Sequence, residues 1–184
     1  MKNTMFYVTM LAMLLAAVLT GTAFAQAEIT TTINWEDVSA MVEEAGISGD
    51  FYAVGDTGLC MWIPDDVFTE VELTDEDVEN GFIAYLTTED ESAVVSVSYA
   101  QIEDVTVDDY YGLVADVEGV EELEMDAVNG IAAVSYNLPE QDSWTVSFVD
   151  DEGYIYEFTF APMSDEGFQQ IAAIMAASIQ TVED

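Results

Sequence analysis

The sequence predicts an α+β domain in which helices flank a largely antiparallel β-sheet. In the stretch from Trp144 to Phe160, aromatic and aliphatic residues alternate with polar ones on both sides of an acidic turn containing Gly153. This alternation is typical of a β-hairpin. Asn129-Gly130 lies between two other apolar runs and is a strong signal for a tight hairpin turn. After Pro162, apolar residues recur at helical spacing and predict a helix that covers the sheet.

The first 25 residues have the features of a bacterial secretory signal peptide. Lys2 precedes an apolar run over 5–19, and Ala23-Phe24-Ala25 matches an A-x-A cleavage site. The run is short for a membrane span, which needs about 20 residues. We therefore expect cleavage before Gln26, a secreted or extracytoplasmic location, and no membrane span in the mature chain.

The mature chain is the size of one domain. We divide the sequence into a signal peptide (1–25), an N-terminal lead-in and helix (26–48) and a single α+β domain (49–184). Gln26 to Ile33 is predicted to be a loose lead-in. The helix that follows has apolar residues at helical spacing after a possible N-cap, Asn34, and ends at Gly46.

The remaining elements follow from alternation, helical spacing and turn residues. Between residues 50 and 101, we predict strands at 50–54 and 59–63, an acidic surface connection at 65–80 with a short helical turn near 74–78, and strands at 82–87 and 92–101. Beyond residue 105, we predict a helix at 107–117 capped by Thr106, strands at 122–128, 131–138, 144–148 and 154–160, and a terminal helix that is capped by Ser164 and reaches Ile179.

Charge is the most unusual property of the chain. All 38 acidic residues follow the signal peptide, whereas the single basic residue, Lys2, lies within it. With 38 acidic side chains and neither Lys, Arg nor His, the mature chain has a formal charge of −38. Nucleic acid is excluded as a partner because phosphate binding requires cations. Mutual repulsion opposes compaction, so added salt should stabilise the fold.

The same composition removes most catalytic chemistry. Without His, Lys or Arg there is no Ser-His-Asp triad, no imidazole base and no arginine clamp for phosphate. Cys60 is the single cysteine of the sequence, so an internal disulfide cannot form, and the mature chain contains no cationic side chain to activate its thiol. Asp56-Thr57-Gly58 matches the triplet of aspartic proteases, but these are also ordinary turn residues between two predicted strands. A carboxylate-based hydrolase remains as a remote alternative.

Calcium is the metal best suited to an acidic chain, because Ca²⁺ binds oxygen ligands. No cofactor is predicted apart from this ion. Three acidic clusters could supply ligands, although none matches the EF-hand pattern. They comprise Asp75, Asp77 and Glu79; Glu89, Asp90 and Glu91; and Asp150, Asp151 and Glu152. The alternative is that these residues form solvated acidic turns with diffuse counterions.

Aromatic residues offer a possible interaction surface. Trp35, Tyr52, Tyr110 and Tyr111 could contribute to it. Tyr111 lies off the apolar stripe of its predicted helix, which makes it the best candidate for an exposed interaction residue. The other aromatic residues are expected to pack in the core.

Several local features together resemble the PsbP-like fold group between about Phe51 and Gln180. They are an apolar strand ending in proline (Met61-Trp62-Ile63-Pro64), a Thr-capped helix after a valine-rich strand (106–117), the Asn129-Gly130 turn, and a final strand pair leading into a helix that ends near Ser178-Ile179-Gln180. The resemblance implies an α/β/α sandwich around an antiparallel sheet. It also implies an exported or partner-binding protein rather than an enzyme, and no functional residue can be transferred.

We therefore expect a secreted, highly acidic, non-enzymatic domain that binds a protein or a cationic partner. A calcium-binding module that uses the acidic turns is the alternative.

Overall fold

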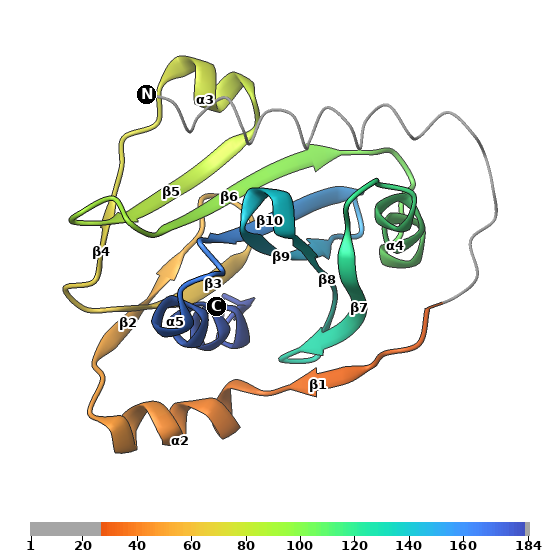
Figure 1. Ribbon diagram of the computed structural model, residues 1–184. Coiled ribbons are helices and arrows are strands. Elements are labelled where there is room, and N and C mark those ends of the chain that lie inside the picture. The colour runs from red at the N-terminus through yellow and green to blue at the C-terminus, as the bar shows by residue number, and fades with distance from the viewer. Residues whose placement is uncertain (1–26, 183–184) are drawn as a thin grey trace.

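The computed structural model describes residues 27–182, so the predicted signal peptide and its cleavage site lie outside the described residues. Elements are labelled as in Figure 1. A large sheet contains eight strands in the order β1-β7-β8-β9-β10-β6-β5-β4. Its strands are β1 (Thr31–Ile33), β4 (Phe68–Glu70), β5 (Phe82–Thr88), β6 (Val94–Gln101), β7 (Glu121–Val128), β8 (Ile131–Leu138), β9 (Ser143–Val149) and β10 (Tyr154–Ala161).

A smaller sheet and short helices complete the fold. The small sheet has the order β11-β3-β2 and consists of β2 (Gly49–Ala53), β3 (Leu59–Pro64) and β11 (Gln180–Thr181). The helical segments are α2 (Trp35–Ala45), α3 (Asp75–Glu79), α4 (Val107–Ala115), the 3₁₀ turn η1 (Pro139–Gln141) and α5 (Glu166–Ala177). None of these helices is long and apolar enough to cross a membrane.

Pairing is antiparallel throughout both sheets except between β1 and β7, which are parallel. The predicted hairpin forms as β9 and β10, with Phe158 opposite Val146. Asn129 and Gly130 both have positive φ, as the tight turn between β7 and β8 requires. The largely antiparallel α+β fold predicted from the sequence is confirmed.

The two faces of the large sheet pack against different layers. On one face, Phe158, Phe160 and Met175 belong to a cluster that joins the sheet to α5 and to β3 (Figure 1). On the other face, Tyr110 and Val114 of α4 pack with Tyr136 of β8 in a second cluster. The sheet is thus the central layer of an α/β/α sandwich.

The structure contradicts the predictions for three short segments and for one helix N-cap. Residues 31–33 are not a loose lead-in: as β1 they hydrogen-bond to β7, and the Asn129 N–H donates to the Ile33 carbonyl at 2.8 Å. The connection after β3 contains β4, and the chain after α5 contains β11. The N-cap of α5 is Asp165 rather than Ser164, because the Asp165 carboxylate accepts from the Phe168 N–H at 2.8 Å.

Helix α2 packs less completely than its apolar spacing predicts. Met41 is 63% exposed, and Val42 is the residue of α2 that is buried. Asn34 is the N-cap residue, but its side chain makes no capping hydrogen bond. The Trp35 N–H instead donates to Oδ1 of Asn129 at 2.6 Å. The start of the helix is therefore fixed by the β7–β8 turn.

Candidate functional site

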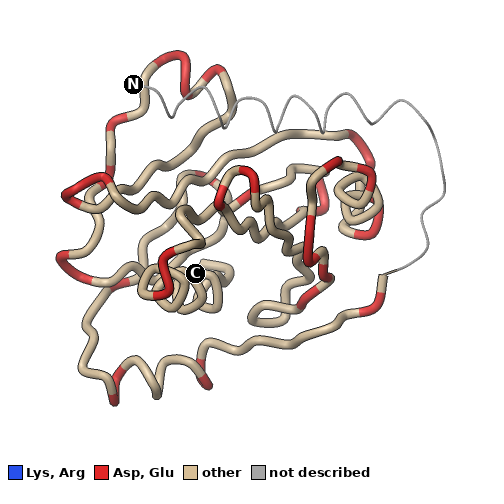
Figure 2. The backbone as a smooth tube through the Cα atoms, viewed as in Figure 1, with Lys and Arg blue, Asp and Glu red and all other residues tan. Residues whose placement is uncertain are grey.

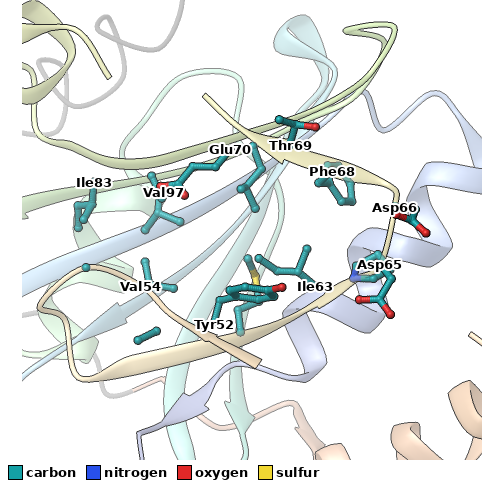
Figure 3. Close-up of a pocket in the computed structure, with 16 residues that line it drawn as sticks. Tyr52, Val54, Ile63, Asp65, Asp66, Phe68, Thr69, Glu70, Ile83 and Val97 are labelled. Carbon is teal, nitrogen blue, oxygen red and sulfur yellow. The ribbon is translucent and has the colours of Figure 1, made fainter. Parts of the chain in front are cut away.

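A cleft of about 820 Å³ opens between the β2–β3 hairpin and strands β4 and β5. Figure 3 shows Tyr52 and Ile63 on the hairpin side, with Phe68, Thr69 and Glu70 of β4 across from them. Sixteen residues line it: Tyr52, Ala53, Val54, Gly55, Met61, Ile63, Pro64, Asp65, Asp66, Phe68, Thr69, Glu70, Ile83, Ala84, Leu86 and Val97.

The walls of the cleft are apolar and its rim is acidic. Val97 and Met61 are almost fully buried, so they form the base, whereas Tyr52 is 51% exposed. Asp65, Asp66 and Glu70 are exposed. The cleft is bounded at two places, because Phe168 of α5 packs edge-on against Phe68 of β4 and Gly55 of the β2–β3 turn packs on Ile83 of β5. An open apolar hollow with a polar rim is typical of a binding site rather than of a core.

The turn from Val54 to Leu59 fixes one end of the cleft. Oγ1 of Thr57 donates to the Val54 carbonyl at 2.7 Å and accepts from the Leu59 N–H at 3.1 Å. Gly55 has a φ of 50°, and a Cβ there would lie 2.5 Å from Cγ2 of Ile83. Asp56-Thr57-Gly58 therefore lies in a hairpin turn, as the turn interpretation predicts, and the preceding Gly55 packs closely on β5.

The acidic clusters singled out in the sequence serve local backbone structure. Oδ2 of Asp77 accepts from the Thr74 N–H and hydroxyl in a capping box at the start of α3. Asp90 accepts from the hydroxyls of Thr88 and Ser92 within its turn, and these hydrogen bonds lower its pKa. Oδ1 of Asp150 accepts from the Glu152 and Tyr154 N–H groups.

The structure does not assemble these clusters into a metal centre. Across residues 27–182, no three His, Cys, Asp or Glu side chains lie together in a way that could hold a metal ion. Figure 2 shows the carboxylate-bearing segments spread over turns, helices and strand ends around the sheet. Asp75, Glu79, Glu89, Glu91, Asp151 and Glu152 are exposed members of these clusters. Calcium binding through these turns therefore remains a prediction that needs its own measurement.

The aromatic residues are placed differently from the sequence expectation. Tyr111 is only half-buried but packs against the second cluster, so it is not the freely exposed ring that we predicted. Tyr110 is fully buried. Phe51, Tyr52 and Tyr99 are 40%, 51% and 40% exposed, and they are the most exposed aromatic side chains of residues 27–182. Tyr99 follows Val95 and Val97 in the alternation of β6, but unlike these two buried residues it is largely accessible to solvent.

A buried carboxyl group, Glu157, was not anticipated from the sequence. It is 4% exposed and lies on the α4 side of β10. Its Oε1 accepts from the hydroxyls of Tyr110 at 2.6 Å and Tyr136 at 3.2 Å. Burial raises the pKa of Glu157, and the hydrogen bonds oppose that rise only in part. Burial and the neighbouring carboxylate also raise the pKa of both phenols, which therefore remain protonated donors.

Glu157, Tyr110 and Tyr136 are all buried, so this cluster lies inside the packed fold and not in an open cleft. Its chemistry is that of a buried hydrogen-bonded group that holds α4 to the sheet. A carboxylate-based hydrolase requires two carboxyl groups that face each other in an open site. The buried cluster of Glu157, Tyr110 and Tyr136 does not provide such a site.

Comparison with known proteins reveals a similar fold. No protein-family model matches the chain, and no curated protein sequence matches it. Among solved structures, the chain is similar to the solution structure of cyanobacterial PsbP (CyanoP) from Synechocystis sp. PCC 6803. The TM-score is 0.50 at 14% identity, over 73% of this chain and 93% of that chain. The chain therefore has a PsbP-like fold, as the sequence resemblance predicted, and this likeness concerns the fold alone.

Proposed function

We propose that this protein is an extracytoplasmic, non-enzymatic domain that binds a protein partner in the cleft between the β2–β3 hairpin and β4–β5. The observation that carries the proposal is the open apolar cleft itself, with exposed Tyr52 at its mouth and three carboxylates on its rim. The signal-peptide features of residues 1–25 and the PsbP-like fold support the location and the binding role.

The rim defines the kind of partner. Asp65, Asp66 and Glu70 face no cation within the described residues, because the one basic residue of the chain is Lys2. A partner segment with apolar side chains flanked by Lys or Arg would fill the walls and pair with the rim. An anionic partner would be repelled.

Site-specific photo-cross-linking tests the proposal. A benzophenone amino acid is placed at Tyr52 in the cleft and, as a matched position on the opposite side of the sheet, at Tyr111. We expect a protein to be cross-linked in the native envelope through position 52 and not through position 111. The binding of that protein, once purified, should weaken when the cleft is filled by Thr69→Trp.

Three outcomes contradict the proposal. Cross-linking through position 111 alone would move the interaction surface to α4, as the sequence first indicated. Cross-linking at neither position would remove the cleft as a protein-binding site. Equal binding of the purified partner to the wild-type protein and to Thr69→Trp would show that the cleft is not where the partner lies.

A further inference from the structure

The aromatic stripe of β10 continues beyond the layer that covers it. Phe160 and Phe158 are fully buried, whereas Tyr156 and Tyr154 further along the same face are only half-buried. Tyr99 of β6 lies directly opposite Tyr156 in the sheet register. The three tyrosines form one wall of an open groove of about 640 Å³, which we call the tyrosine groove.

The rings of the tyrosine groove are arranged as a stacking surface. Tyr154 and Tyr156 are stacked, with centroids 6.2 Å apart and planes at 11°. Tyr99 and Tyr154 are also 6.2 Å apart, tilted at 42°. A set of partly exposed rings held on two adjacent strands offers π faces at little conformational cost.

Carboxylates stand beside these rings. Asp56 of the β2–β3 turn and Asp150 and Glu152 of the β9–β10 turn line the same groove. Oδ2 of Asp150 accepts from the Tyr156 hydroxyl at 3.2 Å. Burial, followed by the charge of Asp150, raises the pKa of Tyr156 to about 12, so this phenol stays neutral in the physiological range.

The groove therefore combines the two elements that recognise an organic cation. Aromatic faces attract a cation through the ring quadrupole, and carboxylates pair with its charge. No Lys, Arg or His of the described residues can fill this role from within the chain. The guanidinium group suits the groove better than an ammonium group, because it is planar, stacks on aromatic rings and pairs with carboxylates in two positions at once.

We propose that the tyrosine groove binds an arginine side chain of a basic polypeptide segment. This inference rests on the proposed protein-binding role and specifies the chemistry of the partner. The groove adjoins the cleft, since Ile83 lines both and the β2–β3 turn separates them. One extended segment can place apolar residues in the cleft and an arginine in the groove.

Titration of the full mature chain with a tetra-arginine peptide tests the inference, with tetra-lysine and tetramethylammonium as comparison ligands. We expect tetra-arginine to bind more tightly than tetra-lysine at matched ionic strength, with shifts of the Tyr99, Tyr154 and Tyr156 ring resonances. Tyr99→Leu/Tyr154→Leu should weaken tetra-arginine binding about fivefold or more, since each ring contributes cation–π attraction. Tyr99→Phe/Tyr154→Phe, which keeps both rings, should bind as the wild type does.

A matched pair of charge variants distinguishes arginine binding in the groove from general electrostatic attraction to the acidic protein. Asp56→Asn/Glu152→Gln and Glu43→Gln/Glu44→Gln each remove two exposed carboxylates, the second pair from α2. Tetra-arginine should bind the groove variant more weakly than the α2 variant. Equal losses in both, or equal affinity for tetra-lysine, would overturn the inference and leave only general attraction. Tighter binding of tetramethylammonium than of tetra-arginine would overturn the inference and indicate that the groove binds a small organic cation.

The two proposals fail separately. A partner cross-linked at position 52 whose affinity is unchanged in the Tyr99→Leu/Tyr154→Leu variant would refute the arginine groove and keep the binding cleft. Specific arginine binding without any cross-link at position 52 would support the arginine groove and refute the binding cleft.

Discussion

The two faces of the large sheet differ in how completely they are covered and in what they bury. The α4 face is closed and holds a buried carboxyl group, Glu157, between two tyrosine hydroxyls. The α5 face is apolar at its centre, around Phe158 and Phe160. The cleft and the tyrosine groove lie open to solvent beside this packed region. The closed α4 face thus buries a hydrogen-bonded carboxyl group beneath α4, whereas the open part of the α5 face exposes tyrosine and apolar side chains beside carboxylates.

Removing an aromatic ring from the α5 face should have the largest effect on stability. Phe158 has no exposed surface and packs edge-to-face with Phe148 at 5.8 Å. Phe158→Ala should lower the free energy of unfolding by about 3–5 kcal/mol, because it removes buried surface and leaves a cavity. Urea unfolding measures the loss, and Phe158→Leu should lose less. A loss under about 1 kcal/mol would show that this face is not the principal core.

Truncating the buried carboxyl group on the α4 face should have the next largest effect. Glu157→Ala leaves the hydroxyls of Tyr110 and Tyr136 without their acceptor and should cost about 2–3 kcal/mol. The same unfolding experiment measures this change. Glu157→Gln keeps an acceptor oxygen and should lose much less at low pH. Equal losses in the two variants would contradict a role for these hydrogen bonds.

The pH dependence of stability should distinguish the two faces. Because the folded-state pKa of Glu157 is raised, the native state holds this proton at pH values where the unfolded chain has released it. The contribution of Glu157 to stability is therefore full below the ordinary carboxyl pKa and falls as pH rises toward the folded-state pKa. Glu157→Gln should remove this part of the pH dependence, and Phe158→Leu should retain it.

The control for this pH experiment is Glu43→Gln, which removes an exposed carboxylate from α2. The stability of Glu157→Gln relative to this control should increase as pH rises above the ordinary carboxyl pKa and level off above the folded-state pKa of Glu157. A constant difference across the pH range would mean that Glu157 ionises alike in the folded and unfolded states.

Salt should produce the smallest effect, a rise of a few degrees in the melting temperature, because mobile ions screen repulsion among exposed carboxylates. The rise should be the same for the wild type and for Glu157→Gln, since the screened charges lie on the surface. Calcium and magnesium chloride at matched ionic strength should give equal rises. A larger rise with calcium would instead support the calcium-binding alternative and direct mutagenesis to the acidic turns.

Much of the fold could be predicted from local sequence patterns. The β9–β10 hairpin, the Asn129-Gly130 turn and the Thr106 cap depend on neighbouring residues, and all three form as predicted. Strands β1, β4 and β11 were missed because each has only two or three residues and exists through pairing with distant strands. Such short pairings leave no periodicity in the sequence.

The candidate site was harder to predict than the fold. Alternation placed Tyr154 and Tyr156 on the same apolar face as Phe158, but it could not show where the covering layer ends. Alternation likewise places Tyr99 on the same face of β6 as the buried Val95 and Val97, although Tyr99 is exposed. Glu157 stands at a polar position of an alternating strand, which usually faces water, and here α4 covers it. How far the helices and the small sheet extend over the large sheet depends on tertiary packing, which the spacing of residues along the sequence does not predict.

The most direct test of the difference between the two faces is the affinity of the partner captured through position 52 for three purified proteins: the wild type, Thr69→Trp and Glu157→Gln. Binding in the cleft predicts that Thr69→Trp raises Kd at least about tenfold, because the new ring occupies the space of the partner. Glu157→Gln should leave Kd unchanged. An unchanged Kd for Thr69→Trp together with a raised Kd for Glu157→Gln would place recognition on the α4 face and contradict the account.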